Sequence, residues 1–428
     1  MSKLANNQRI CTVINDFTNF HSNKIFFNSP LNFKKMKYRF YFLLLLFVTN
    51  SCRVLAPSFI NTGGTEQTNY FSVIKFENYH GFILVTAKIK GNDYKFMLDT
   101  GAPNAVSKAL QEKLHFKVIN RIPLGDSNGT KDTTAVVSVD ELVFGGVSFN
   151  NIPTIVVDSP QFIDCMKIDG IIGSNMLRNS IIRLSYTDST IVLTDNITKI
   201  DVEKKYASKM VLSKPQSSPY IRVKLMGQKT GREQLLFDTG SRGFYDLADT
   251  NYHRVFKNFP IFKVEAEGYG RSSNGLHGNG QDKKSLRLLL PKMEINGTSF
   301  QNVSTQTSSD NNSRIGHDIL KFGNVTVDYK NKNFYFEPFK DNVDMTEPKF
   351  PISVRVNDNK LFVGFVWDNT LKESIHVGDQ IMAVDDANYE TISICTLMNN
   401  PPLAGKSSVK LRIKANNGQI KEIIIQKQ

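Results

Sequence analysis

The chain has 428 residues, of which 40% are hydrophobic and 22% charged, and these values are typical of a folded soluble protein. Its length predicts about two to four domains. The formal net charge of +13 would suit nucleic acid, but part of the excess lies in the first 51 residues and no basic run interleaves with aromatic residues. We therefore expect no nucleic-acid partner.

Residues 1–51 consist of an upstream segment and a predicted signal peptide. The basic segment 34–39 precedes an apolar stretch, Phe40 to Val48, which is too short to span a bilayer. Because the signal begins so late, Met36 is an alternative to Met1 as the true start. The pattern predicts export from the cytoplasm.

Residues 49–52 resemble the lipobox of a bacterial lipoprotein, in particular the Bacteroidetes type that ends in Ser-Cys. The resemblance implies that Cys52 becomes the lipidated first residue and that a lipid anchor holds the protein at the membrane. Thr49 departs from the stricter pattern, which has Leu there, and cleavage near Ala56 would instead leave a soluble exported protein. Since no acidic cluster follows Cys52, the periplasmic face is favoured over the cell surface.

The cysteines are Cys11, Cys52, Cys165 and Cys395. The first two lie in the signal region, and the other two fall in different predicted domains. We therefore expect no disulfide framework, with Cys165 and Cys395 serving as small apolar core residues.

A polar tether, 52–70, leads into a segment with the pattern of β-structure that continues to about residue 340. Short runs of alternating apolar and polar residues predict strands at 82–89, 221–225 and 325–329. Residues 107–114 are the best short helix, with Ser107 as its N-cap.

The tripeptide Asp-Thr-Gly occurs twice, at 99–101 and 238–240, each time after an apolar run. The glycine allows a tight turn that presents the aspartate at an edge, and the threonine hydroxyl can reach the backbone of a facing copy. Two apposed carboxylates cannot both ionise easily, so one keeps a proton. The ionised carboxylate can take a proton from water while the other donates to a peptide carbonyl, with no metal or cofactor.

An internal repeat surrounds the two tripeptides. Residues 146–154 and 297–305 both fit Gly-x-Ser-Phe-x-Asn-x-x-Thr, and residues 171–177 match 314–320. The landmarks keep the same order with nearly equal spacing. The repeat predicts two lobes of one fold, residues 71–200 and 201–340, which pair within one chain.

These motifs resemble the aspartic proteases of the retropepsin/pepsin superfamily over roughly residues 71–340. The resemblance implies Asp99 and Asp238 as the catalytic dyad. It implies that the catalytic loops contain Thr100, Gly101, Thr239 and Gly240. It also implies that the hydrophobic-hydrophobic-Gly strands beneath the loops contain Gly173 and Gly316. Small lobes favour two fused retropepsin-like lobes over a pepsin.

The superfamily also holds an extended peptide under a mobile hairpin flap. Two glycine-rich segments are candidates, and their residues are Gly125, Gly129, Gly268, Tyr269 and Gly270. The alternative, flexible surface loops, remains open. His317 and Asp318 occupy the repeat position of residues 174–175, and we expect them to face solvent.

A linker, 341–350, precedes a third unit at 351–428. Its signature runs from Val377 to Asp386, followed by a helix-like stretch at 391–399 and strands at 409–414 and 420–426. This pattern resembles a PDZ domain of the kind attached to bacterial periplasmic proteases. The resemblance implies capture of a ligand peptide by strand addition. No Gly-Leu-Gly-Phe pattern occurs near residues 359–362, so the unit could instead only pack on the lobes.

The sequence thus predicts a mostly β protein with two pseudo-symmetric aspartic protease lobes and a small PDZ domain. The predicted function is an exported, lipid-anchored aspartic endopeptidase that acts on peptides or proteins without cofactor or metal. The alternative is a catalytically silent exported protein that uses the lobes and the PDZ domain to bind peptides. The presence of both aspartates and both threonines argues against that alternative.

Overall fold

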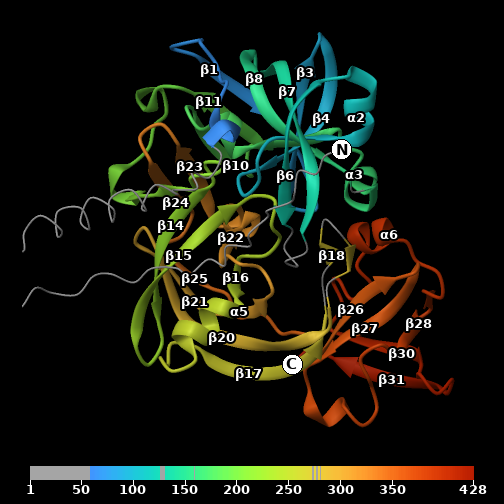
Figure 1. Ribbon diagram of the computed structural model, residues 1–428. Coiled ribbons are helices and arrows are strands. Elements are labelled where there is room, and N and C mark those ends of the chain that lie inside the picture. The colour runs from blue at the N-terminus through green and yellow to red at the C-terminus, as the bar shows by residue number, and fades with distance from the viewer. Residues whose placement is uncertain (1–57, 126–130, 159, 272–273, 276–277, 280) are drawn as a thin grey trace, which may run out of the picture. The chain divides into compact units, whose positions relative to one another are not determined.

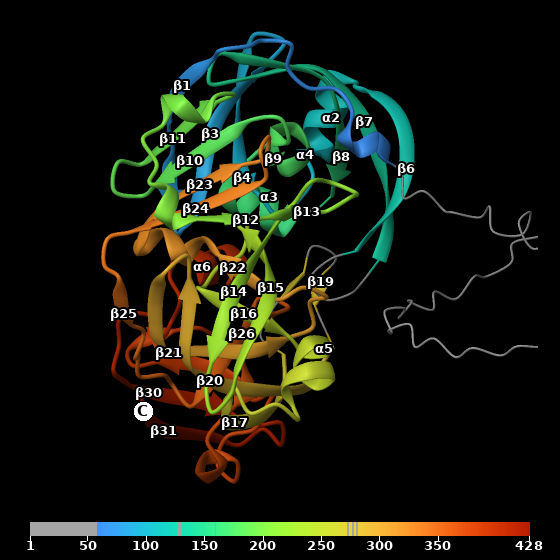
Figure 2. The same ribbon diagram turned by 90° about the vertical axis from the view of Figure 1, so that its left-hand side faces the viewer.

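β-Strands make up most of this computed structural model (Figures 1 and 2), as the sequence predicts. The structure describes residues 58–125, 131–158, 160–271, 274–275, 278–279 and 281–428, all of which belong to one compact unit. The predicted signal, Cys52 and the flap candidate Gly129 lie outside the described residues. Within these ranges no helix has the length and apolarity needed to cross a bilayer.

The first lobe is an eight-stranded sheet in the order β2-β3-β4-β9-β5-β8-β7-β6, and a β3–β7 pairing closes it on itself. Its strands are β2 (Glu77–Tyr79), β3 (Phe82–Ile89), β4 (Asn92–Asp99), β5 (Ala105–Ser107), β6 (Lys117–Gly125), β7 (Lys131–Phe144), β8 (Val147–Val157) and β9 (Gly170–Gly173). The helices are η2 (Ser58–Asn61), α2 (Lys108–Leu114), α3 (Pro160–Met166) and α4 (Ser174–Leu177).

The second lobe repeats this plan in a nine-stranded sheet, β13-β14-β15-β22-β16-β21-β20-β17, with β25 beside β21. Its strands are β13 (Val211–Leu212), β14 (Pro219–Met226), β15 (Thr230–Asp238), β16 (Tyr245–Ala248), β17 (Lys263–Gly270), β20 (Lys283–Ile295), β21 (Thr298–Ser308), β22 (Arg314–Gly316) and β25 (Asn342–Asp344). Short elements are α5 (Asp249–Asn251), η5 (Tyr252–Phe256), η6 (His317–Lys321) and the pair β18 (Asn274–Gly275) and β19 (Gly278–Asn279).

A third sheet, in the order β1-β11-β10-β23-β24-β12, joins the lobes. Its strands are β1 (Phe71–Lys75), β10 (Ile181–Ser185), β11 (Thr190–Thr194), β12 (Ala207–Lys209), β23 (Gly323–Asp328) and β24 (Asn333–Pro338), with the short helices η3 (Ile197–Lys199) and η4 (Lys204–Tyr206) nearby in sequence. The antiparallel pairing of β10 with β23, Ile181 opposite Asp328, makes the sheet continuous across both lobes. One buried apolar cluster likewise contains residues of both.

The backbone explains why the repeated Gly-x-Ser-Phe-x-Asn-x-x-Thr motif has its glycine and asparagine. Gly146 and Gly297 end the two-residue turns β7–β8 and β20–β21, where φ is 77° and 88°. Glycine adopts such positive φ angles without steric cost, and this hairpin turn requires them. Asn151 and Asn302 follow in the left-handed region at φ 53° and 56°. Equal backbone demands therefore keep equal residues in both lobes.

Two secondary-structure predictions for the first lobe, one strand and one helix, are confirmed. The strand expected at 82–89 is β3, and the helix after Ser107 is α2. The Ser107 hydroxyl accepts a hydrogen bond from the Leu110 backbone N–H at 3.0 Å, which makes it the N-cap. Within the predicted tether, however, Ile60 is buried and its carbonyl accepts a hydrogen bond from Asn175.

The C-terminal module, residues 351–428, has an apolar core of its own. Its sheet runs β26-β27-β28-β30-β31, with β29 beside β28. The elements are β26 (Ile352–Asn357), β27 (Lys360–Val366), η7 (Asn369–Leu371), β28 (Gln380–Val384), β29 (Ala387–Asn388), α6 (Ile394–Asn399), β30 (Ser408–Lys414) and β31 (Ile420–Gln426). The predicted helix-like stretch and both closing strands are present.

A disulfide joins Cys165 in α3 to Cys395 in α6, so the prediction that both are unpaired core residues is wrong. The two helices lie side by side and bring the Cα atoms to 4.9 Å, within the range that a disulfide spans. The Tyr79 hydroxyl donates to the Cys165 carbonyl at 3.1 Å and also contacts Asn399. A pairing across 230 residues leaves no spacing signal in the sequence.

Candidate active site

The two Asp-Thr-Gly loops begin where buried strands end. Asp99 is the last residue of β4 and pairs with Gly173 of the parallel strand β9. Asp238 is the last residue of β15 and pairs in the same way with Gly316 of β22. The four predicted residues therefore hold equivalent places in the two lobes.

The threonines lock the loops together across the lobes. The Thr100 hydroxyl donates to the Phe237 carbonyl at 2.7 Å, and the Thr239 hydroxyl donates to the Leu98 carbonyl at 2.8 Å. Each hydroxyl also accepts a 3.1 Å hydrogen bond from the other threonine's backbone N–H. Both side chains are fully buried, so these bonds are shielded from water. Each threonine hydroxyl thus contacts the backbone of the facing loop in the other lobe.

The glycines of the loops face the opposite carboxylates. A Cβ atom on Gly101 would lie 2.5 Å from Asp238 Cγ, and one on Gly240 would overlap the Asp99 carboxyl. Each aspartate also accepts a backbone hydrogen bond within its own loop, from the Gly101 N–H at 2.7 Å and from the Gly240 N–H at 2.9 Å. Any larger residue at either glycine would push the aspartates apart.

Gly173 and Gly316 lie directly beneath the Asp-Thr-Gly loops. A Cβ atom on Gly173 would overlap the backbone of Pro103, and one on Gly316 would lie 2.6 Å from the Ser241 carbonyl oxygen. Only glycine allows this close approach of two backbones. Both glycines therefore lie against the backbone that follows the Asp-Thr-Gly of their own lobe.

Burial dominates the electrostatics of Asp99. Burial raises the pKa of Asp99 well above its ordinary range, and the neighbouring Asp238 carboxylate raises it further, while the Gly101 N–H acts in the opposite direction. Both burial and the neighbouring carboxylate favour the protonated form, so Asp99 keeps its proton to a higher pH than an isolated aspartate does.

Residues 85–176 match a family model described as aspartyl protease. This segment is therefore similar to an aspartyl protease, and it includes Asp99, Thr100, Gly101 and Gly173. The match supports protease activity in general. The second loop, with Asp238, lies beyond the matched residues, and a search of curated proteins found no match to the chain.

Arg314 is the main site residue that the sequence analysis missed. Its guanidinium donates through Nη1 to Asp238 Oδ2 at 2.6 Å and through Nη2 to Asp310. The first lobe has Ile171 at the matching register position, opposite Met97 as Arg314 is opposite Leu236. Aligning the two repeats shows arginine at 314 where the first lobe has isoleucine at 171. The sequence does not show that Arg314 contacts Asp238 on the neighbouring strand.

Other unpredicted contacts hold the first loop from both sides. The Ser174 hydroxyl donates to the Thr100 carbonyl at 2.6 Å and lies 2.9 Å from the Tyr329 hydroxyl. From the second lobe, the Gln216 side-chain amide donates to the Gly101 carbonyl at 2.7 Å. Residues of the second lobe thus fix the backbone that carries Asp99.

His317 is buried, so the expectation that it faces solvent is wrong. It packs against Gly81, where a Cβ atom would overlap its ring, and its ring centroid lies 5.2 Å from that of Phe82. Burial lowers the pKa of His317, with an opposing effect from Asp318. Because β22 turns into η6 beneath the loop, the residue after Gly316 points into the packing between the lobes.

The flap candidates lie at the ends of two equivalent hairpins. Gly125 ends β6 in the first lobe, while Gly268, Tyr269 and Gly270 end β17 in the second. Tyr269 is exposed, but Gly268 faces Phe365 and Trp367 of the C-terminal module. The second-lobe hairpin is therefore in contact with the module.

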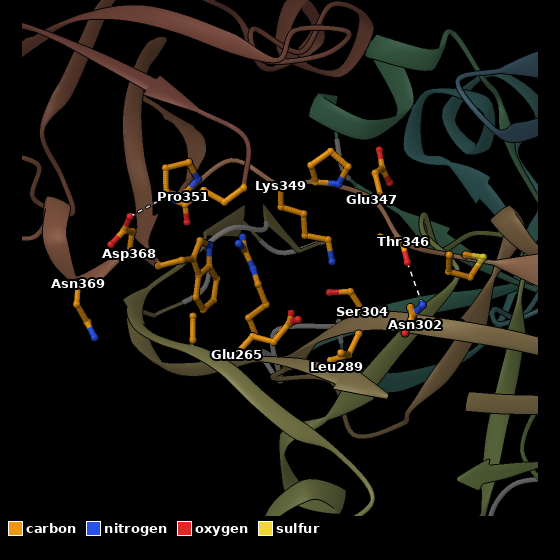
Figure 3. Close-up of a pocket in the computed structure, with 16 residues that line it drawn as sticks. Glu265, Leu289, Asn302, Ser304, Thr346, Glu347, Lys349, Pro351, Asp368 and Asn369 are labelled. Carbon is orange, nitrogen blue, oxygen red and sulfur yellow. Dashed lines mark hydrogen bonds between the residues drawn. The ribbon is translucent and has the colours of Figure 1, made fainter. Parts of the chain in front are cut away.

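A cavity of about 750 Å³ lies between this hairpin and the module (Figure 3). Its lining comes from β17, β20 and β21, from residues 345–349, and from the module, and it does not include Asp99 or Asp238.

The described residues contain no group of three or more His, Cys, Asp or Glu side chains placed to hold a metal ion.

Proposed function

We propose that this chain is an aspartic endopeptidase that hydrolyses peptide bonds with water activated by Asp99 and Asp238. The observation that carries the proposal is the reciprocal lock between Thr100 and Thr239, which sets the two aspartates against each other's loop. A tight turn alone would explain one Asp-Thr-Gly. It would not explain two that interlock.

The chemistry needs one ionised and one protonated carboxyl. The ionised carboxylate takes a proton from water as the water oxygen bonds to the peptide carbonyl carbon, and the protonated carboxyl donates its proton to the carbonyl oxygen. In the second step the dyad takes a hydroxyl proton from this tetrahedral intermediate and delivers a proton to the nitrogen. The C–N bond then breaks, which releases an acid and an amine and restores the dyad.

The C-terminal module, as a PDZ domain, would recruit or position the peptide. Strand β26 is at one end of the module's sheet, the position at which strand addition takes place. Contacts of the module with both lobes, through Cys165 and through Gly268, support a positioning role.

Export with a lipid anchor at Cys52, facing the periplasm of a bacterial envelope, completes the proposal. The Cys165–Cys395 disulfide supports export, because such bonds persist in oxidising compartments.

The test is digestion of a mixed peptide library with purified protein between about pH 4 and 8. The wild type should cleave internal peptide bonds, and Asp99→Asn should lower the rate by about 10²–10⁴-fold, since it removes an acid–base group. Asp140→Asn, an exposed residue of β7, is the matched control and should cleave normally. Cleavage that survives in Asp99→Asn would refute the proposal. No cleavage by the wild type would favour the silent peptide-binding alternative.

A further inference from the structure

The pair of aspartates is not symmetric, because a cation, Arg314, contacts Asp238 and, among the described residues, no cation forms an ion pair with Asp99. Arg314 Nη1 lies 2.6 Å from Asp238 Oδ2, and the side chains of Arg314 and Asp238 are only 15% and 7% exposed. An ion pair so sheltered is little screened by salt and is strengthened by charge-assisted hydrogen bonding. In the first lobe the equivalent Ile171 offers Asp99 no charge.

The structure holds the Arg314 side chain in place from a second side. Its other terminal nitrogen, Nη2, pairs with Asp310 in the loop that leads into β22. Arginine presents two parallel donors in a rigid plane, so it can bridge two carboxylates without losing either contact. Burial would lower the pKa of Arg314, but the carboxylates of Asp238 and Asp310 outweigh it and raise the pKa. The guanidinium is therefore a permanent positive charge.

Several other ionisable groups face this ion pair. Asp246 on β16 has its pKa raised to about 6, because burial outweighs the opposing effects of Arg314 and Ser241. Tyr220 on β14 is close enough to Asp310 and Arg314 for both to affect its pKa, which burial raises. On the other side of the dyad, Tyr329 lies near Asp99, and burial raises its pKa as well. None of these groups supplies a second positive charge.

We infer that Arg314 assigns fixed roles within the dyad, so that Asp238 is the ionised base and Asp99 is the protonated acid. Asp238 then takes the proton of the attacking water, and Asp99 donates its proton to the substrate carbonyl oxygen. The assignment rests on the proposed function for its chemistry, but the location of the proton is a property of the folded protein alone. Arg314 is a positioning residue here, since it acts through Asp238.

The consequence is a dyad that stays singly protonated over a wide pH range. A cation within about 4–6 Å lowers the pH at which a carboxylate takes up a proton by about 1–3 units. Removing the charge of Arg314 should therefore let the dyad take up its second proton at a pH about 1–3 units higher. If the protein cleaves peptides, the acidic limb of the kcat/KM profile should move by the same amount.

The experiment is a titration of the full-length protein in which the aspartate side-chain carboxyls carry ¹³C. Asp99→Asn and Asp238→Asn assign the two signals. The wild type should show a protonated Asp99 and an ionised Asp238 at neutral pH. Arg314→Met should move the uptake of the second proton upward, and Arg314→Lys should restore much of the original behaviour. Arg287→Met is the matched control, because that arginine is partly buried against Trp367 and should leave the titration unchanged.

A wild-type signal that places the neutral-pH proton on Asp238, or an Arg314→Met titration that matches the wild type, would overturn the inference. Because the readout needs no substrate, a protein that titrates as expected but cleaves nothing would contradict only the proposed function. Should Arg314→Met fail to fold, the wild-type titration alone decides where the proton lies.

Discussion

At the scale of single residues, the site combines a symmetric frame with asymmetric charge. Thr100 and Thr239 make the same contacts in both directions, and the glycines beside them leave the same space. Asp99 and Asp238 nevertheless differ, because Arg314 makes a direct contact with Asp238 and affects the pKa of Asp99 only through its charge, as the weakest of several influences. Both lobes carry the repeated motif, and Arg314, which stands where the first lobe has Ile171, places a charge beside the second aspartate.

The raised pKa of Asp99 predicts that this residue costs stability at neutral pH. Its pKa in the folded protein lies above the unfolded value, so stability falls as pH rises from about 4 towards the folded pKa. Asp99→Asn should therefore stabilise the protein at pH 7, with an advantage that grows by at most about 1.4 kcal/mol for each pH unit above 4. Thermal unfolding at several pH values measures this. An advantage that is equal at pH 4 and pH 7 would contradict the prediction.

His317 should make the protein less stable in mild acid. Its pKa in the folded protein is lowered by burial, so the unfolded chain binds the proton more tightly as pH falls below about 6.5. Asp318 opposes this effect, while Lys321 and Arg242 reinforce it. Between pH 7 and 5 the wild type should lose stability more steeply than His317→Gln in denaturant unfolding. Parallel pH slopes for the two proteins would show that His317 is not responsible.

The residues also show how far the sequence could lead. The positions of Asp99, Asp238 and their threonines could be predicted because the Asp-Thr-Gly motif recurs at the same place in both repeats. The strand and the turn of each copy depend only on residues that are close together in the sequence. The Arg314 contact with Asp238 depends on the pairing of β15 with β22 within the second lobe. The Gln216 contact and the burial of His317 depend on residues that meet only when the two lobes pack together. No spacing along the chain encodes either kind of contact.

At the scale of elements, the second-lobe hairpin has a partner in the C-terminal module. Beyond the end of β17, the Arg271 N–H donates to the Gly364 carbonyl of β27 at 3.2 Å, and Gly268 packs on Trp367. Trp367 in turn stacks on Phe365 at 4.7 Å between ring centroids. The glycine-rich composition of residues 268–270 predicts a hairpin tip. It does not predict that the C-terminal module contacts this tip.

Trp367→Ala should loosen this hairpin selectively. The side chain is buried, and loss of a buried aromatic of this size costs about 3–5 kcal/mol of local packing. Hydrogen exchange should accelerate in β17 and β20, while β6 and β7 of the first lobe, which serve as the internal control, keep their rates. Equal acceleration in both hairpins would mean that Trp367 supports the whole fold and not this contact.

At the scale of the whole molecule, the lobes and the module are connected by contacts far apart in sequence. The sheet that contains β10 and β23 unites the lobes, and the disulfide ties α3 of the first lobe to α6 of the module. The two-lobed fold could be predicted because the internal sequence repeat indicates two similar units. The disulfide could not, since either cysteine is equally compatible with a buried apolar position.

Loss of the Cys165–Cys395 bond should lower stability by about 2–5 kcal/mol, because it releases a long loop in the unfolded chain. Cys165→Ser and Cys395→Ser should lower the thermal midpoint by similar amounts, and the double variant should be no worse. A reducing agent should lower the midpoint of the wild type alone. Additive losses in the double variant would indicate that each cysteine acts through packing.

The central claim is that Asp238, which lies beyond the segment similar to aspartyl proteases, completes the site begun by Asp99. The most direct test is kcat/KM of Asp238→Asn on the best-cleaved library peptide. The account predicts a fall of about 10²–10⁴-fold, equal in kind to that of Asp99→Asn, with the protein still folded. Near wild-type activity in Asp238→Asn would contradict it and would require Asp99 to find its partner elsewhere.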